Sequence, residues 1–177
     1  METHQGIVIR KATQADLAAI NAIYNRAVQH STATFQIEPI TEAERAAWFL
    51  DHPEQTHPVF VAEAGGQVVG WGSLSRYHSR CAYRFSVEDS IYVSESHRRN
   101  GIGSLLLDRL VCAARDLGHH TVIAQIADHN GASIRLHEKF GFRTAGELSQ
   151  AGFKFGRWLD VTIMQRVLAE CRMKNEE

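Results

Sequence analysis

The sequence predicts a mixed α/β (α+β) fold in which a central mixed sheet is flanked by helices. Segments with the two-residue apolar alternation of strands and segments with helical apolar spacing both occur, and they do not alternate strictly. The expected order is β-α-α-β-β-β-α-β-α-β-β, whereas a doubly wound dinucleotide-binding fold alternates strands and helices one by one. A length of 177 residues fits one domain over residues 1–177.

The first elements are a strand and a helix. "GIVIRKA" alternates apolar and polar residues, which predicts a strand over about Ile7–Lys11. Thr13 followed by Asp16 has the pattern of a capping box, in which two side chains bond the free amides of a helix start. We therefore expect a helix that runs to about Val28.

A second helix and a hairpin follow. Thr41 and Glu44 repeat the capping-box pattern ahead of the apolar pair Trp48 and Phe49. "VFVAEAGGQVVGWGSL" contains two β-rich runs joined by two glycines, which is typical of a β-hairpin. "FSVEDSIYV" predicts the next strand.

The second half predicts two helices and three strands. An apolar stripe with spacings of four, three and four indicates a helix between Gly103 and Gly118, and the stripe consists of Leu106, Leu110, Ala113 and Leu117. "TVIAQIA" predicts a buried strand. Asn130 is a suitable N-cap for a further helix that ends at Gly141. "FRTAGEL" and "WLDVTIMQRVL" predict closing strands.

Composition and charge exclude several classes of function. The chain is 44% hydrophobic with a formal net charge of −1, so no global field favours nucleic acid or an anionic membrane. No apolar run is long enough for a membrane span, and the N-terminus lacks the apolar core of a secretion signal. Three separated cysteines without a CxxC pair suit a reducing cytoplasm. We expect a cytoplasmic protein without nucleic-acid or membrane partners.

The segment "RRNGIG" before a predicted helix has the properties of an anion site. Gly101 and Gly103 allow a tight turn and a close approach of the backbone to a ligand. The helix start adds free amides and a positive dipole end, and Arg98 and Arg99 add charge, so phosphate is the natural occupant. An ordinary tight turn is the alternative, since neither a GxxxxGK loop nor the third glycine of a dinucleotide fingerprint is present.

Two segments in this order resemble the GNAT superfamily of acyl-CoA-dependent N-acetyltransferases. "RRNGIG" is similar to the family's pyrophosphate pattern Arg/Gln-x-x-Gly-x-Gly/Ala, and "NGASIRLHEKFGF" to a later helix that ends in Gly-Phe. "VEDSIYV", "IRLHEKFGF" and "FGRWLDVTIMQ" look like the phosphinothricin and methionine sulfoximine acetyltransferase branch. The resemblance runs from "IRKAT" to "MQRVL". It implies a mostly antiparallel sheet and a homodimer.

The resemblance also implies a cofactor, acetyl-CoA, used as co-substrate. A backbone amide near Tyr92 or Val93 is expected to meet the thioester oxygen, where the family splays two strands apart. The residues that match the family's cofactor site are Ile91, Tyr92, Val93, Arg98, Arg99, Asn100, Gly101, Ile102, Gly103, Ser104, Asn130 and Ser133.

Glu88 and His137 are the candidate catalytic residues. Burial in an apolar strand would raise the pKa of Glu88 toward the range of a general base, and the resemblance supports that role. Pairing of Glu88 with Arg84 or Arg98 is the alternative. His137 stands where many GNAT enzymes carry a Tyr, so the resemblance implies proton donation to the thiolate or help in deprotonation. A structural histidine is the alternative.

The loop "SRYHSRCAYRF", residues 75–85, is the candidate acceptor site. Its arginines suit a carboxylate and its tyrosines suit a pocket wall, although a solvated cationic loop is the alternative. Phe35 is a candidate for the substrate-side wall, or else a core residue. The predicted substrate-binding residues are Tyr77, His78, Arg80, Tyr83, Arg84, Asp89 and Ser90.

The function expected from these features is acetyl transfer to the α-amine of a small amino-acid-like acceptor, such as phosphinothricin, methionine sulfoximine or methionine sulfone. No metal is expected, because the ten histidines form no HxxxH, HExxH or His/Cys pattern. The alternatives are a GNAT enzyme for polyamines, aminoglycosides or protein N-termini, and a non-catalytic acyl-CoA sensor. The cationic loop argues against polycationic acceptors.

Overall fold

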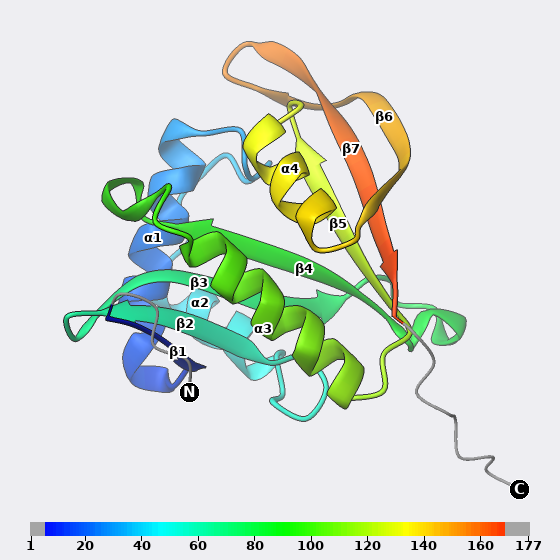
Figure 1. The fold of residues 1–177 in the computed structure, drawn as a ribbon. Helices are drawn as coiled ribbons and strands as arrows, with labels where there is room; N and C mark the ends of the chain where they lie inside the picture. The colour runs from blue at the N-terminus through cyan, green and yellow to red at the C-terminus, as the bar shows by residue number, and fades with distance from the viewer. Residues whose placement is uncertain (1–5, 169–177) are drawn as a thin grey trace, which may run out of the picture.

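The computed structural model describes residues 6–168, and all of their strands join one seven-stranded sheet of order β1-β2-β3-β4-β5-β7-β6 (Figure 1). The strands are β1 (Ile7–Lys11), β2 (Val59–Ala64), β3 (Gln67–Arg76), β4 (Ser86–Val93), β5 (Thr121–Ala127), β6 (Arg143–Lys154) and β7 (Arg157–Val167). The helices are α1 (Leu17–His30), α2 (Glu42–Leu50), α3 (Ile102–Asp116) and α4 (Gly131–Lys139). The predicted fold class and order of elements are confirmed.

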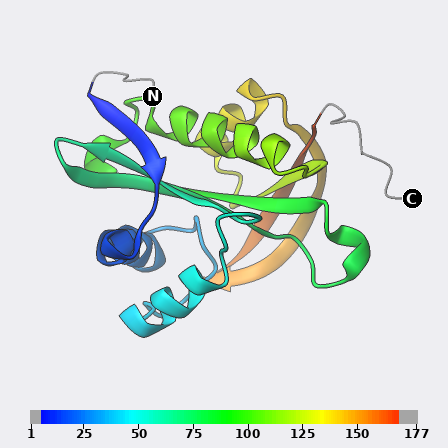
Figure 2. The same cartoon turned by 90° about the horizontal axis from the view of Figure 1, so that it is seen from below.

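The sheet is antiparallel at every pairing except that of β4 with β5, which run parallel. The helices form two layers, with α3 and α4 on one face of the sheet and α1 and α2 on the other (Figure 2). None of the helices within residues 6–168 is long and apolar enough to cross a membrane.

Local signals set the helix starts as predicted. Thr41 Oγ1 accepts from the Glu44 amide at 3.2 Å while Glu44 Oε2 accepts from the Thr41 amide at 2.7 Å, which completes the second capping box. The first box, in which the Thr13 amide donates to Asp16 Oδ2 at 2.8 Å, opens a short 3-10 turn rather than α1 itself. Helix α1 starts after this turn and continues to His30, two residues past the expected end.

The core lies mainly between α3 and the sheet. Leu106 and Leu110 are fully buried and Ala113 nearly so, as the apolar stripe predicts. Leu117 was predicted to belong to the same buried stripe, and this is wrong: it is the C-cap of α3 and is 37% exposed. On the other face, Trp71 of β3 packs under α1 and α2.

The last two strands form a hairpin longer than predicted. "FRTAGEL" covers only the first part of β6, which continues to Lys154 and turns at 155–156 into β7. The β6–β7 pairing has two register irregularities, one between Thr144 and Gly146 and one between Leu148 and Gly152. The β6 residues inside the second irregularity are exposed. Of the three cysteines, Cys81 and Cys112 are free, and Cys171 lies outside the described residues.

Candidate active site

A cavity of about 1200 Å³ opens where β4 and β5 separate. The two strands pair only over Ser86–Glu88 with Thr121–Ile123, and beyond these three pairs β5 pairs with β7 alone. The gap that opens is the splay that the family resemblance implies. The cavity is lined by α1, the loop 31–35, β4, the turn 94–104, the end of β5 and the start of α4.

The glycine turn before α3 lies at one side of this cavity. Gly101 has φ +77° and forms the N-cap of α3, and Arg99 before it also has a positive φ of 65°. The Ser104 amide donates to the Gly101 carbonyl at 2.9 Å, so the helix begins directly at the turn. The helix N-terminus and the flanking arginines therefore face the cavity together, which is the arrangement that binds phosphate.

Most of the predicted cofactor residues line the cavity. The exception is Asn100, which is exposed and not part of the wall. Asn130 caps α4 with its Oδ1, which accepts from the Ser133 amide at 3.2 Å. The predicted residues in the wall are Ile91, Tyr92, Val93, Arg98, Arg99, Gly101, Ile102, Gly103, Ser104, Asn130 and Ser133.

The backbone of β4 presents free edges to the gap. Antiparallel pairs alternate, and the Ser94 amide bonds to Val69 of β3, so every second residue before Ser94 also faces β3. Tyr92 thus directs its amide toward β3, whereas Ile91 and Val93 direct theirs toward the separated β5. Of the two amides expected to meet the thioester oxygen, that of Val93 is therefore directed toward the gap and that of Tyr92 is not.

Glu88 lies in the cavity wall and is held by a neutral partner. Gln125 Nε2 of β5 donates to Glu88 Oε2 at 2.9 Å. Burial raises the pKa of Glu88, and the bond from Gln125 only partly offsets this effect. Within residues 6–168, neither Arg84 nor Arg98 forms an ion pair with it. The alternative of a structural ion pair is therefore not what the structure contains.

His137 lies on the opposite side of β4, in a buried pair with Asp89. Its Nε2 is 3.1 Å from Asp89 Oδ2, and its Nδ1 is 2.7 Å from the Ser133 carbonyl. Both partners are acceptors, so both ring nitrogens are assigned as donors. Burial lowers the pKa of His137, but the hydrogen bond to Asp89, the charge of that carboxylate and the bond to the Ser133 carbonyl together outweigh burial, and the net pKa is raised. Asp89, predicted to bind substrate, is 6% exposed and is engaged by His137.

The loop 31–35 closes the cavity on the α1 side. The hydroxyls of two tyrosines contact this loop. Tyr24 Oη is 3.0 Å from Thr34 Oγ1, and Tyr92 Oη is 3.5 Å from the Ala33 carbonyl. Of this loop, only Phe35 was predicted to be a wall residue, and it does line the cavity. The tyrosines that hold this loop are distant from it in the sequence. No local sequence pattern therefore predicts its position.

The predicted acceptor loop is not part of the cavity in this chain. Ser75 of β3 pairs with Glu88 of β4, and the pairing ends one residue further on. The loop therefore follows the end of the strand pair that is opposite to the gap. Its rings pack on one another, with Tyr77 and His78 within 5.6 and 5.0 Å of Tyr83. The predicted residues outside the wall are Tyr77, His78, Arg80, Tyr83 and Arg84, whereas Asp89 and Ser90 are part of it.

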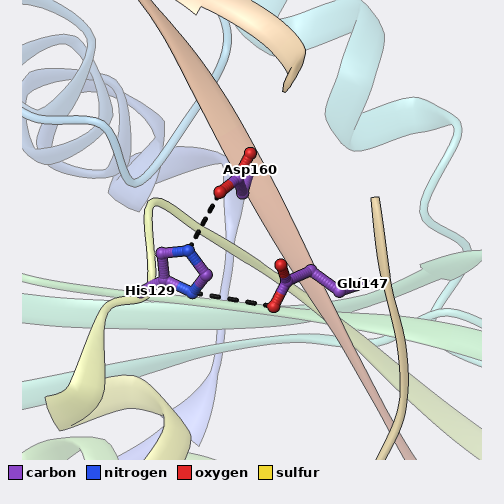
Figure 3. Close-up of side chains that lie close together, drawn as sticks. All are labelled: His129, Glu147 and Asp160. Atoms are coloured by element: carbon purple, nitrogen blue, oxygen red, sulfur yellow. Dashed lines mark hydrogen bonds and ion pairs between the residues drawn. The ribbon is translucent and has the colours of Figure 1, made fainter. Parts of the chain in front are cut away.

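One group of possible metal ligands occurs within residues 6–168, formed by His129, Glu147 and Asp160 (Figure 3). His129 lies between the two carboxylates, with Nε2 3.0 Å from Asp160 Oδ2 and Nδ1 3.8 Å from Glu147 Oε2. Because opposite ring nitrogens face the two acids, the imidazole bridges them rather than converging with them on one point. The group links the turn before α4 to the β6–β7 hairpin.

Comparison with known proteins supports one family. The profile of the acetyltransferase (GNAT) family matches residues 20–142. The chain is 42% identical over 164 residues to the L-methionine sulfoximine/L-methionine sulfone acetyltransferase of Salmonella typhimurium, an alignment covering 93% of this chain and 96% of that protein. It is 39% identical over 162 residues to the phosphinothricin N-acetyltransferase of Streptomyces viridochromogenes, covering 90% and 87%.

A solved structure agrees with the sequence comparison. A GNAT superfamily phosphinothricin acetyltransferase from Sinorhizobium meliloti, in complex with AcCoA, aligns with a TM-score of 0.90 at 41% identity. The alignment covers 93% of this chain and 89% of that one. Both the fold and the sequence therefore match the same group of proteins.

Proposed function

The chain belongs to the acetyltransferase (GNAT) family, and we propose that it transfers the acetyl group of acetyl-CoA to the α-amine of a small amino-acid-like acceptor. Phosphinothricin, methionine sulfoximine and methionine sulfone are the acceptor types that its relatives support. The observation that carries the proposal is the cavity at the β4–β5 gap, which joins the glycine turn on one side of the sheet to Glu88.

The turn 98–104 fits the diphosphate of the coenzyme. A Cβ built on Gly101 meets nothing within 4 Å, so the turn is open to a ligand rather than packed on protein. The first-turn amides of α3 and the guanidinium groups of Arg98 and Arg99 supply hydrogen bonds and positive charge. When bound, acetyl-CoA supplies an acetyl thioester, whose carbonyl carbon accepts the amine.

Glu88 removes the proton that blocks the acceptor. An amine with a pKa roughly two units above neutral is only about 1% unprotonated, a cost of ~2.7 kcal/mol. Burial raises the pKa of Glu88, which brings the carboxylate closer to the basicity that proton transfer at neutral pH needs. The side chain of Glu88 shares a strand face with Tyr92, whose ring packs against Tyr24 of α1 at 5.3 Å. The acceptor therefore approaches from the α1 side.

Two backbone amides and His137 stabilise the negative charge that develops on the thioester oxygen and sulfur. The free amides of Ile91 and Val93 are oriented to stabilise the carbonyl oxygen as it becomes negative. The amine nitrogen forms the new C–N bond while the C–S bond breaks. Glu88 first releases the ammonium proton to solvent and then takes the second nitrogen proton as the amine adds. The sulfur takes a proton from His137, which leaves a thiol and a neutral imidazole.

We propose a cytoplasmic homodimer. Exposed aromatic side chains on the β6–β7 hairpin, namely Phe153, Phe155 and Trp158, support a protein interface, since large exposed apolar groups tend to gather at interfaces. Light scattering after size exclusion tests the dimer, and a mass of one chain at micromolar concentration would contradict it.

The acetyl-transfer proposal is tested by following thiol release from acetyl-CoA over an amine panel. The panel contains phosphinothricin, methionine sulfoximine, methionine sulfone, common amino acids, a polyamine, an aminoglycoside and a peptide with a free N-terminus. We expect turnover with the first three compounds. Turnover confined to the polyamine, aminoglycoside or peptide would overturn the acceptor assignment, and coenzyme binding without turnover on any amine would favour a sensor.

A further inference from the structure

Two cations are buried on the α1 side of the sheet without an acid beside them. Lys154 of β6 is 5% exposed and Arg45 of α2 is 2% exposed. Within residues 6–168, neither has a carboxylate oxygen within 4.0 Å. Burying a charge costs several kcal/mol unless an opposite charge or strong hydrogen bonds compensate it. Two such buried cations on one side of the sheet therefore need an explanation.

Lys154 lies directly behind the wall of the cavity. Its Nζ donates to the Ser31 carbonyl at 2.9 Å and to the Thr34 carbonyl at 2.8 Å. Both residues line the cavity, so only the backbone of this loop separates the ammonium from an acceptor bound there. Carbonyl oxygens satisfy its hydrogen bonds but leave its full charge in place. Burial accordingly lowers the pKa of Lys154.

Arg45 lies deeper on the same side of the sheet, in a box of aromatic rings that are not themselves part of the cavity wall. Its Cζ is 4.7 Å from the ring centre of Tyr24, 4.5 Å from that of Trp48 and 5.3 Å from that of Trp71. Its Nη2 has no hydrogen-bond partner. The aromatic faces stabilise the cation without cancelling its charge.

Two stacked rings, those of Trp71 and Tyr92, separate Arg45 from the cavity. Trp71 stacks on Tyr92 with centres 4.9 Å apart and an interplanar angle of 24°, and Tyr92 lines the cavity. Burial raises the pKa of Tyr92, and the positive charge of Arg45 acts in the opposite direction. The field of this guanidinium is therefore felt at the cavity wall.

We infer that Lys154 and Arg45 determine acceptor specificity by holding a positive potential at the α1-side end of the cavity. This potential favours amines that carry a carboxylate next to the reacting nitrogen and disfavours neutral amines and polycations. The inference rests on the proposed function and names its substrate class.

The same arrangement orients the acceptor. A zwitterion has an ammonium and a carboxylate on one carbon, and Glu88 in the wall attracts the ammonium. The two buried cations attract the carboxylate, so the field aligns the amine with its base. A neutral amine lacks the second attraction, and a polycation is repelled.

The test compares a charged and a neutral acceptor in matched variants. Lys154→Met removes the charge at nearly constant length, and Lys154→Arg keeps it. The acceptors are methionine sulfone and its carboxamide, which differ in the carboxylate alone. We expect Lys154→Met to lower kcat/KM for methionine sulfone roughly tenfold more than for the carboxamide, the size of a unit charge acting over about 10 Å in a partly buried site. Lys154→Arg should retain the wild-type ratio.

The outcomes separate this inference from the proposed function. An equal loss on both acceptors in Lys154→Met, with Lys154→Arg also impaired, would show that Lys154 only holds the loop and would overturn the inference while acetyl transfer stands. Absence of turnover with every amine in the wild type would overturn the proposed function itself. If Lys154→Met does not fold, Arg45→Met and Arg45→Lys provide the same comparison from helix α2, and an unchanged acceptor ratio there overturns the inference.

Discussion

His137 Nε2 and Asp89 Oδ2 lie 3.1 Å apart in a pair whose side chains are 5% and 2% exposed. The carboxylate and the Ser133 carbonyl accept from opposite nitrogens of the ring. This arrangement favours the doubly protonated imidazole, which donates a proton and does not accept one. The sequence left three roles open for His137, namely acid, base and structural histidine. Because both ring nitrogens are bonded to acceptors, neither is free to accept a proton, and proton donation to the thiolate stays a proposal.

Asp89→Asn should destabilise the fold more in mild acid than in alkali. The folded pKa of His137 is raised, so its contribution is fully present below the unfolded value of about 6.5 and is lost as the pH rises through the folded pKa. We expect a loss of about 1–3 kcal/mol in the free energy of unfolding at pH 6, and a smaller loss at pH 9. Urea unfolding of both proteins at the two pH values measures it, and an equal loss at both would contradict the charged pair.

Glu88→Gln should lower kcat by roughly 10²- to 10⁴-fold with little change in the Kd of acetyl-CoA, because a general base acts only on the chemical step. Comparable losses in both quantities would refute the base assignment. Isothermal titration with the coenzyme and steady-state kinetics provide the two numbers.

Gln125→Leu should move the acid limb of the kcat/KM profile to higher pH. Gln125 donates to Glu88 and lowers its pKa, so removing the donor leaves the raising effect of burial unopposed. A pH–rate profile of the variant beside wild type shows the direction. A limb that stays in place or moves to lower pH would mean that Glu88 does not set it.

Gly101→Val should abolish coenzyme binding while the fold persists. Gly101 and Gly118, at opposite ends of α3, have φ of +77° and +79°, and a Cβ on either meets nothing within 4 Å. Valine at either position therefore costs a similar backbone strain of roughly 1–2 kcal/mol. Gly118→Val is the matched control, and it should bind acetyl-CoA normally. Equal binding by the two variants would remove the glycine turn from the coenzyme site.

Gly152→Ala should change acceptor binding from outside the cavity wall. A Cβ at Gly152 would overlap Cε2 of Phe35, so the ring must move, and Phe35 lines the cavity. We expect a change of roughly tenfold in the acceptor KM with an unchanged Kd for acetyl-CoA. Gly146→Ala, on the same strand with nothing within 4 Å, is the control. Identical kinetics for the two variants would show that Phe35 does not shape the acceptor site.

Features that depend on neighbours in the sequence were predictable. The capping box at Thr41, the glycine turn at Gly101 and the strand that carries Glu88 each follow from residues within a few positions of one another. The family resemblance, confirmed by the match over residues 20–142, added acetyl-CoA and the splay of two strands.

By itself, the sequence determined the order of the elements and the chemistry of the glycine turn, because backbone propensities and caps act over one or two helical turns. Only the tertiary structure decided what the side chains meet. Asp89 reaches His137 across 48 residues, and Lys154 reaches Ser31 across 123. The β3–β4 register places the arginine-rich loop outside the cavity. Sheet order and register bring such distant residues together, and no local pattern encodes them.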